Sequence, residues 1–323
     1  MKNVYISSCT PDGGVRLFAF DGETLTQRAF SPAGRVMYTA REGGVLYAAA
    51  LERDGLDSFV VRAALTDGVP GPFGGKRPTG RESCFIDVRD GDFYTADYSS
   101  AGVTKNGVQT VTHSGCGTDP ARQEAPHPHQ ALVTPDGKFV LVCDLGLDRV
   151  FVYDRDLTPV SYADVPKGQG VRHLTFAPDG RRVYAVNELG CSITEFDYAD
   201  GRLTALRTTA LPCAGKSYAG AIRLSEDGGL LFVSLRGDDV IAVCKPTPDG
   251  PVLLRRFPCG GCWPRDFAVC GERLIVANER LRAAAVRPSV SRFPFSMSCS
   301  GRSSFFIFSR QAMPAANGTA ESQ

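Results

Sequence analysis

The chain has 323 residues, and its 36 Lys and Arg residues nearly balance its 35 Asp and Glu residues. This balance argues against nucleic acid or a membrane surface as a partner bound through bulk charge. No apolar run approaches the ~18–20 residues that a membrane span needs. The first residues, MKNVYISSCT, show no signal-peptide pattern. We therefore expect a cytoplasmic protein with no nucleic-acid and no membrane partner.

Short apolar runs separated by turns recur from the first residues to about residue 280. The N-terminal unit, Val4 to Thr26, begins at its second strand, and Pro126 to Asp154 shows the full pattern around one Pro-Asp-Gly turn. Runs this short, rich in Val, Phe, Leu and Tyr and bounded by Asp, Gly and Pro, are typical of antiparallel strands. The turn glycines recur at spacings of 47, 46, 43, 48 and 43 residues, and they are Gly44, Gly91, Gly137, Gly180, Gly228 and Gly271.

This repeat has the length of a propeller blade, which is one four-stranded sheet per ~40–50 residues. Seven units in 323 residues average about 46 residues each. The sequence therefore predicts an all-β fold, a seven-bladed β-propeller formed by residues 1–280.

The predicted topology gathers polar side chains at one mouth of the central channel. In each blade the inner strand runs toward the glycine turn and the next strand returns from it. His129 and Arg172 lie eight residues before their turn glycines, and Arg265 takes the equivalent place if the last turn is two residues shorter. Side chains in equal register point the same way, because a strand has a period of two residues. The returning strands end at the same mouth in Asp144, Asn187 with Glu188, Arg236, and Asn278 with Glu279.

Other interpretations of this mouth remain open. Charged residues at strand ends are often only solvated, or they link neighbouring blades through hydrogen bonds. Arg172 beside His173, and His127 with His129 in the PHPH segment, are unusual for a solvated rim. Clustered arginine with a carboxylate and histidine suits a small anionic ligand. His127 and His129 could instead ligate a metal, but the nearby arginines would repel a divalent cation, so we expect no metal and no other cofactor.

At these residues the sequence resembles the propeller-type lactonases. That family includes the bacterial 6-phosphogluconolactonase of propeller form and the fungal 3-carboxy-cis,cis-muconate lactonising enzyme. The resemblance covers residues 1 to about 280. It rests on HxGxGxxPxRQExPHxH at 113–129, GVRHLTFAPDG at 170–180, NEL at 187–189, AIRLSEDG at 221–228 and PRDFA at 264–268.

The resemblance implies a seven-bladed propeller, no required metal, and a channel-mouth site of His, Arg and Glu. By motif, the catalytic roles fall on His127 or His129, on Arg172 and on Glu188. Substrate-binding roles follow less directly for Arg223, Arg236 or Arg265. The remaining polar residues of the mouth, which complete the set of expected substrate-binding residues, are His173, Asp144 and Asn187.

Lactone hydrolysis needs a base that activates water and a positive group for the oxyanion. Glu188 and His129 are both candidate bases; nearby arginine would lower the pKa of Glu188, whereas burial would raise it. No GxSxG elbow is present, which favours direct attack by water. We expect hydrolysis of a sugar lactone, with 6-phosphogluconolactone of the pentose phosphate pathway as the first candidate. The alternatives are lactonisation of a carboxymuconate-like diacid and a non-enzymatic propeller that binds a ligand or a protein.

The repeat pattern ends after Glu279. Residues 281–323 contain five arginines, one acidic residue (Glu321) and no Pro-Asp-Gly turn. We interpret 281–323 as a divergent or frameshifted C-terminal tail, and we expect an irregular last blade and an irregular ring closure. The alternative is a divergent blade in which Ser304 to Phe308 forms the closing strand. The sequence does not indicate an oligomeric state.

Overall fold

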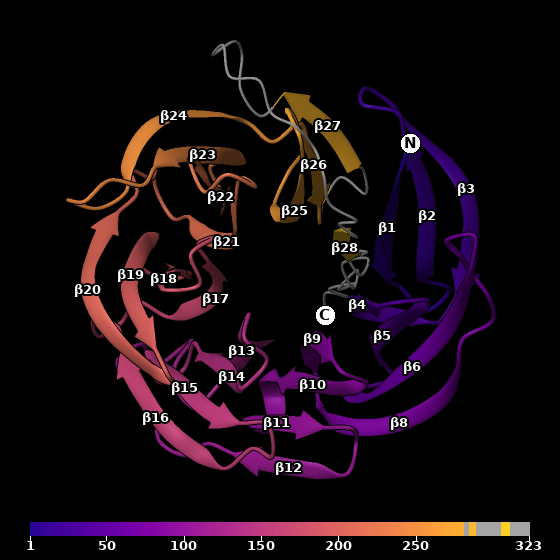
Figure 1. Ribbon diagram of the computed structural model, residues 1–323, viewed down its shortest axis with the longest axis horizontal. Helices are drawn as coiled ribbons and strands as arrows, with labels where there is room; N and C mark the ends of the chain where they lie inside the picture. The colour runs from indigo at the N-terminus through magenta and orange to yellow at the C-terminus, as the bar shows by residue number, and fades with distance from the viewer. Residues whose placement is uncertain (281–283, 289–304, 311–323) are drawn as a thin grey trace, which may run out of the picture.

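The computed structural model describes residues 1–280, 284–288 and 305–310. These residues form 28 β-strands and one 3-10 helix, η1 (Tyr98–Ser100). The sheets surround a central channel as the blades of a propeller (Figure 1), which confirms the predicted all-β, seven-bladed architecture. Within the described ranges, no helix is long and apolar enough to cross a membrane.

The first two blades are joined in one nine-stranded sheet through a single residue pair between β1 and β4. The first blade contains β1 (Lys2–Cys9), β2 (Gly14–Phe20) and β3 (Leu25–Pro32). The second contains β4 (Arg35–Glu42), β5 (Val45–Leu51), β6 (Asp57–Thr66), the short β7 (Val69–Pro70) and β8 (Gly74–Arg81).

Blades three to six are regular four-stranded antiparallel sheets. The third contains β9 (Ser83–Arg89), β10 (Asp92–Asp97), β11 (Gly102–Lys105) and β12 (Gln109–Thr112). The fourth contains β13 (Pro128–Val133), β14 (Phe139–Asp144), β15 (Arg149–Asp154) and β16 (Pro159–Asp164). The fifth contains β17 (Val171–Phe176), β18 (Arg182–Asn187), β19 (Ser192–Ala199) and β20 (Arg202–Ala210). The sixth contains β21 (Tyr218–Leu224), β22 (Leu231–Arg236), β23 (Val240–Lys245) and β24 (Val252–Pro258).

The predicted glycine turns connect the inner strand of a blade to its second strand. Gly91, Gly137, Gly180, Gly228 and Gly271 all have positive φ, between 61° and 80°. Glycine enters this left-handed region without the steric cost that a Cβ atom imposes. The repeated glycine in the sequence is therefore a backbone requirement of the tight turn, and it fixes the register of each blade.

Apolar side chains fill the space between neighbouring blades, including the space between the last blade and the first. There, Val4 and Ile6 of β1 pack in one cluster with Ile275 and Ala277 of β26. This cluster buries both facing surfaces at the point where the ring closes. Hydrophobic burial therefore links the two ends of the repeat array, in addition to strand pairing.

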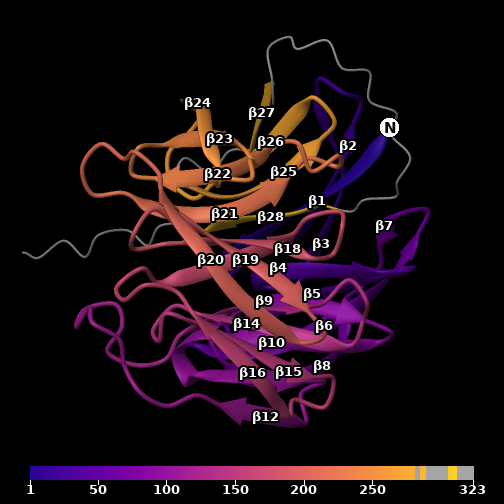
Figure 2. The same ribbon diagram turned by 60° about the vertical axis from the view of Figure 1, so that its left-hand side comes forward.

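The seventh blade and the closure depart from the regular pattern, as predicted. The blade contains β25 (Pro264–Cys270), β26 (Arg273–Asn278) and β27 (Ala284–Pro288). The closing strand β28 (Phe305–Arg310) lies beside β1 (Figures 1 and 2) and pairs with it in parallel, from Val4 with Phe305 to Cys9 with Arg310. In blades two to seven the inner strand instead pairs antiparallel with the second strand.

The sequence pattern indicated no third strand after Glu279, but β27 supplies one and pairs antiparallel with β26 over five residues. Its sequence, AAVRP, is not bounded by the Asp and Gly turn residues that mark the strands of the other repeats. The repeat pattern therefore did not predict this strand. The alternative closing strand at Ser304 to Phe308 overlaps β28. Residues 281–283, 289–304 and 311–323 lie outside the described residues, so the predicted boundary at residue 280 stays a prediction.

Candidate active site

A β-bulge interrupts each inner strand from β4 to β25 near its start, at the same mouth of the channel. In β13, β17 and β25 the bulged residues are His129, Arg172 and Arg265. The corresponding positions in β4 and β9 are Met37 and Cys84. A bulge adds one residue to the strand and re-aims the side chains around it. The bulges therefore explain how consecutive residues such as Arg172 and His173 come to contact each other, although strand alternation alone would separate them.

Glu188 is the centre of the mouth. Its carboxylate pairs with Arg172 at 3.0 Å, with Arg236 at 2.6 Å and with Arg122 at 2.6 Å. The Glu188, Arg172 and Arg236 side chains are only 2–5% exposed. These four residues come from three different parts of the chain, namely blade five, blade six and the long loop before β13, and we call them the arginine–glutamate cluster.

Burial and the arginine charges shift the pKa of Glu188 in opposite directions, and the arginine charges have the larger combined effect. Burial would raise this pKa, but the charges of Arg236, Arg172 and Arg122 hold it well below its ordinary value. Burial and the neighbouring Arg236 lower the pKa of Arg172 to about 9, so Arg172 is still a cation at neutral pH. Glu188 is therefore a fixed anion at neutral pH, and a carboxylate held in this form is a weak proton acceptor.

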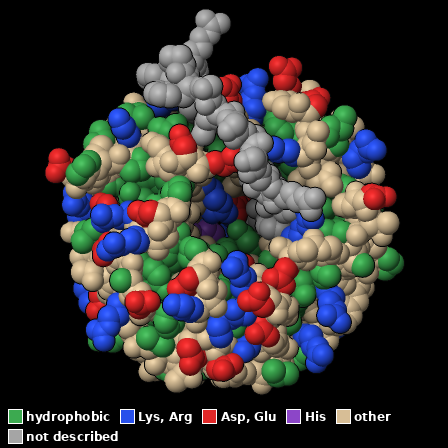
Figure 3. Space-filling view, viewed as in Figure 1, with side chains coloured by type: hydrophobic (Ala, Val, Ile, Leu, Met, Phe, Trp, Pro, Cys, Tyr) green, Lys and Arg blue, Asp and Glu red, His purple; other side chains and the backbone are tan. Residues whose placement is uncertain are grey.

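His129 lies beside the arginine–glutamate cluster as a neutral imidazole. Burial and the charge of Arg172 lower its pKa well below 6.5, while Glu188 opposes this effect and Arg265 adds to it. Its Nδ1 atom is 3.6 Å from the Sγ atom of Cys84. The structure thus places His129, Arg172 and Arg265 at equivalent bulges of three inner strands, with Glu188 paired to Arg172. In the space-filling view the centre of the propeller is hollow and shows Lys or Arg and His side chains inside it (Figure 3).

The other two predicted histidines are held by protein groups. His127 stacks on Tyr98 at 4.2 Å, and its two ring nitrogens lie 3.1 Å from the Tyr98 carbonyl and 3.2 Å from Glu124. His173 lies against the Arg172 guanidinium at 3.3 Å. Burial and the charge of Arg172 lower the pKa of His173 well below 6.5, so it is neutral at pH 7. His127 and His173 thus support the site, and His129 is the buried histidine whose pKa both Arg172 and Glu188 influence.

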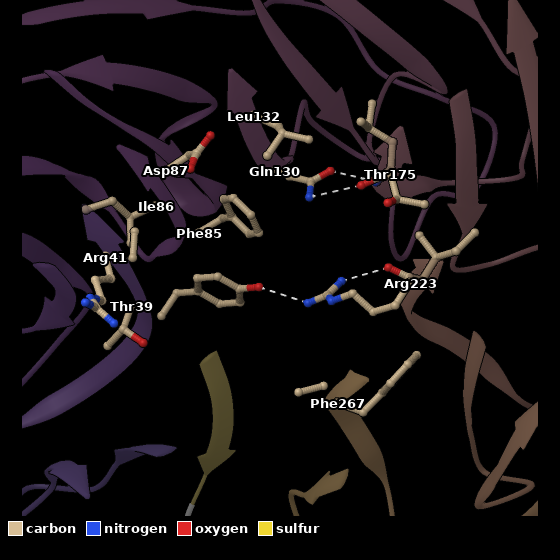
Figure 4. A pocket seen from close by; sticks show the side chains of 15 residues that line it. Thr39, Arg41, Phe85, Ile86, Asp87, Gln130, Leu132, Thr175, Arg223 and Phe267 are labelled. Atoms are coloured by element: carbon tan, nitrogen blue, oxygen red, sulfur yellow. Dashed lines mark hydrogen bonds between the residues drawn. The ribbon is translucent and has the colours of Figure 1, made fainter. Parts of the chain in front are cut away.

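Arg223 lies deeper in the channel than the arginine–glutamate cluster. It pairs with Asp266 at 2.7 Å and donates a hydrogen bond across the channel to the Tyr38 hydroxyl at 3.2 Å. Beyond this bridge is a cavity of about 280 Å³. Figure 4 shows Phe85, Gln130 and Arg223 around this common space. Arg223 therefore lines the cavity behind the mouth, and its contact with substrate stays a prediction.

Two more predicted substrate-binding residues have structural roles. One Asp144 oxygen accepts hydrogen bonds from the backbone N–H groups of His127, Gly146 and Leu147, and the other lies 2.5 Å from His113. Asn187 donates to Ser192 and Thr194 on β19. Asp144 and Asn187 are fully buried. Both side chains tie a strand end to its neighbouring segment, and their contact with substrate stays a prediction.

Sequence reasoning missed Arg122, which completes the arginine–glutamate cluster. Arg122 belongs to the long loop between β12 and β13, and its register to the channel cannot be counted from a turn glycine. The signal was present, because Arg122 stands in the ARQE segment of the motif that ends in PHPH. Arg265, which was placed correctly, pairs with Glu279 at 3.1 Å.

A family model described as "Lactonase, 7-bladed beta-propeller" matches residues 3–287. The chain belongs to this lactonase family. A Lactococcus lactis protein is 36% identical to this lactonase over 211 residues, which cover 58% of this chain and 61% of that protein. A Staphylococcus epidermidis protein is 30% identical over 297 residues, which cover 82% of this chain and 85% of that protein.

Solved structures of similar proteins support the same assignment for this lactonase. The periplasmic gluconolactonase PpgL of Pseudomonas aeruginosa is 26% identical, with a TM-score of 0.77 over 86% of this chain and 89% of that one. A Bacteroides fragilis protein described as a candidate 6-phosphogluconolactonase is 25% identical, with a TM-score of 0.75 over 86% of this chain and 90% of that one. The family resemblance of the motifs is thus confirmed, and the protein is an enzyme of the lactonase class.

Proposed function

We propose that this lactonase hydrolyses an anionic sugar lactone, with 6-phosphogluconolactone as the first candidate, by direct attack of water at the channel mouth. The observation that carries the proposal is the charge of the arginine–glutamate cluster. Three guanidinium groups surround one carboxylate, so this cluster has an excess of two positive charges. Buried cations of this kind favour an anionic ligand and a developing oxyanion.

We assign the general base to His129. The Glu188 carboxylate is ion-paired with three guanidinium groups, so its oxygens are not free to take a proton from water. His129 is neutral at pH 7 and can accept a proton from water as the water oxygen attacks the lactone carbonyl. The imidazolium formed in this step is stabilised by the Glu188 charge, which acts on His129 in that direction. Glu188 therefore has the role of an electrostatic partner of the base.

The arginines stabilise the tetrahedral intermediate. As water forms the new C–O bond, the carbonyl oxygen takes the negative charge, and the Arg172 and Arg236 guanidinium groups are the nearest buried donors to the cluster centre. When the ring C–O bond breaks, His129 returns its proton to the leaving alkoxide. The product is an open-chain hydroxy acid, and no oxidant, reductant or covalent enzyme intermediate is needed.

An initial-rate assay on a panel of lactones tests this proposal. Purified protein in EDTA is compared with the spontaneous opening of 6-phosphogluconolactone, of unphosphorylated gluconolactone and of a carboxymuconolactone. We expect the largest enhancement with 6-phosphogluconolactone. Formation of lactone from the diacid would support the lactonising alternative, and no rate above the blank would support a binding propeller. Loss of activity in EDTA, restored by a divalent ion, would favour the metal site at His127 and His129.

The same proposal includes a cytoplasmic location and a small anionic lactone as the partner, with no nucleic acid and no membrane. A relative named as a periplasmic gluconolactonase shows that the fold also serves outside the cytoplasm. Fractionation of cells, with cytoplasmic and periplasmic marker enzymes as controls, decides the location.

A further inference from the structure

Trp263, the single tryptophan of the chain, is held in an unusual backbone conformation at the mouth. Its φ is 64°, in the left-handed region that a bulky residue rarely adopts. Its backbone N–H donates to Asp239 at 2.7 Å, and its carbonyl accepts the Glu279 N–H at 3.0 Å. Such a conformation persists only where the surrounding structure enforces it, and it is concentrated at functional sites. The backbone of Trp263 is therefore held by Asp239 of blade six and by Glu279, the residue after β26.

Two arginines lie over this indole. The Arg280 guanidinium is 3.6 Å from the ring centroid, and the Arg236 guanidinium is 5.9 Å from it. Because both distances are measured from one centroid, the two guanidinium carbons are at most about 9.5 Å apart, the sum of the two. Arg236 belongs to the arginine–glutamate cluster. Trp263 thus holds a second cation, Arg280, close to Arg236 of the cluster. The separation of the two guanidinium groups is comparable to the length of a small sugar phosphate.

Arg280 differs from the other arginines of the mouth in its partners. Within residues 1–280, 284–288 and 305–310, Arg122, Arg172 and Arg236 pair with Glu188, and Arg265 pairs with Glu279. In the same part of the chain no carboxylate lies in salt-bridge range of Arg280. Arg280 is also exposed to solvent. A guanidinium that lies on an aromatic face keeps its N–H edge available, and that edge matches two oxygens of a phosphate group.

We propose that Arg280, positioned by Trp263, binds a phosphate group of the lactone substrate distant from the carbonyl that reacts. This inference rests on the proposed lactone hydrolysis and adds the residue that selects phosphorylated substrates. The arginine–glutamate cluster then acts on the carbonyl, and Arg280 holds the other end of the molecule. The substrate class that fits both features is a sugar lactone with a terminal phosphate monoester.

The test is the preference of the enzyme for 6-phosphogluconolactone over gluconolactone, given as the ratio of the two kcat/KM values. Arg280→Gln should lower this ratio about 10- to 100-fold, the range expected when a hydrogen-bonded charge contact is lost. Trp263→Leu should lower it in the same direction, and Trp263→Phe, which keeps an aromatic face, should lower it less. Arg202→Gln removes an exposed charge on β20 that the mouth does not use, and it should leave both kcat/KM values unchanged.

An unchanged ratio in Arg280→Gln would overturn the inference, and so would an equal fall in Arg202→Gln. If the native protein opens neither lactone, the proposed hydrolysis fails, and calorimetric titration then tests the phosphate contact alone. The native protein should bind 6-phosphogluconate more tightly than gluconate, and Arg280→Gln should remove that difference. A difference that survives in Arg280→Gln would refute the assignment of Arg280 whatever the enzyme hydrolyses.

Discussion

Replacing Glu188 by glutamine removes the charge that holds three arginines together at the mouth. The carboxylate is 2.6–3.0 Å from its partners and the side chain is 4% exposed. Removing one partner of a buried ion pair costs about 3–5 kcal/mol, because the remaining charge stays buried without compensation. Arg122 is 33% exposed and adds less than the two buried arginines. For a chain of this size we expect Tm to fall by roughly 5–15 °C at pH 7.

The pH dependence of this effect has a definite sign. The arginines hold the pKa of Glu188 below its ordinary value of 4.5 in the folded protein. The carboxylate therefore stabilises the fold above about pH 4.5, and this contribution is lost as the pH falls through the lowered folded pKa. The Tm difference between the native protein and Glu188→Gln should be largest near neutral pH and should shrink in acid. Thermal scans from pH 3 to pH 8 measure it directly.

Blade five contains a matched control for this experiment. Glu195 is also 4% exposed and pairs with two arginines, Arg182 at 3.2 Å and Arg207 at 3.4 Å, away from the mouth. Glu195→Gln should lower Tm while kcat/KM stays at the native value, whereas Glu188→Gln should lower both. A native Tm for Glu188→Gln at pH 7, or a Tm difference that grows in acid, would refute the reasoning.

The remaining predictions concern His129. His129→Asn should lower kcat/KM about 10²- to 10⁴-fold with little change in Tm, because a general base contributes a factor of this order. In the native enzyme, kcat/KM should fall on the acid side only well below pH 6.5, because burial and Arg172 lower the pKa of His129. An acid limb centred near pH 7, or one that persists unchanged in His129→Asn, would assign the base to another residue.

The blades could be predicted because one backbone requirement recurs. Five of the six predicted turn glycines have positive φ, and in blade two Gly43 has it in place of Gly44. Their spacing sets both the number of blades and the place of each inner strand. Counting back from Gly137 and Gly180 located His129 and Arg172 at the mouth, and the shorter last turn located Arg265. The bulges at these positions were not predicted, because a bulge leaves no fixed residue pattern on an inner strand.

The residues that sequence reasoning missed or misplaced depend on contacts between distant segments. Arg122 reaches Glu188 from a loop whose path no repeat defines. Asp144 has the same strand-end position as Asn187, and its carboxylate accepts hydrogen bonds from backbone N–H groups of the segment beside it. The direction of the pKa shift of Glu188 could not be predicted either, because it depends on the distances from its carboxylate to the three arginines. The parallel pairing of β28 with β1 could not be derived from a tail without turn signals.

The central claim is that the arginine–glutamate cluster stabilises the oxyanion of a lactone, and Arg172 is its most buried member. The most direct measurement is kcat/KM for 6-phosphogluconolactone in the native enzyme and in Arg172→Met, with circular dichroism to show that the variant is folded. The account predicts a loss of about 10²- to 10³-fold, the range found when one oxyanion donor is removed. A folded Arg172→Met variant that opens the lactone at the native rate would contradict it.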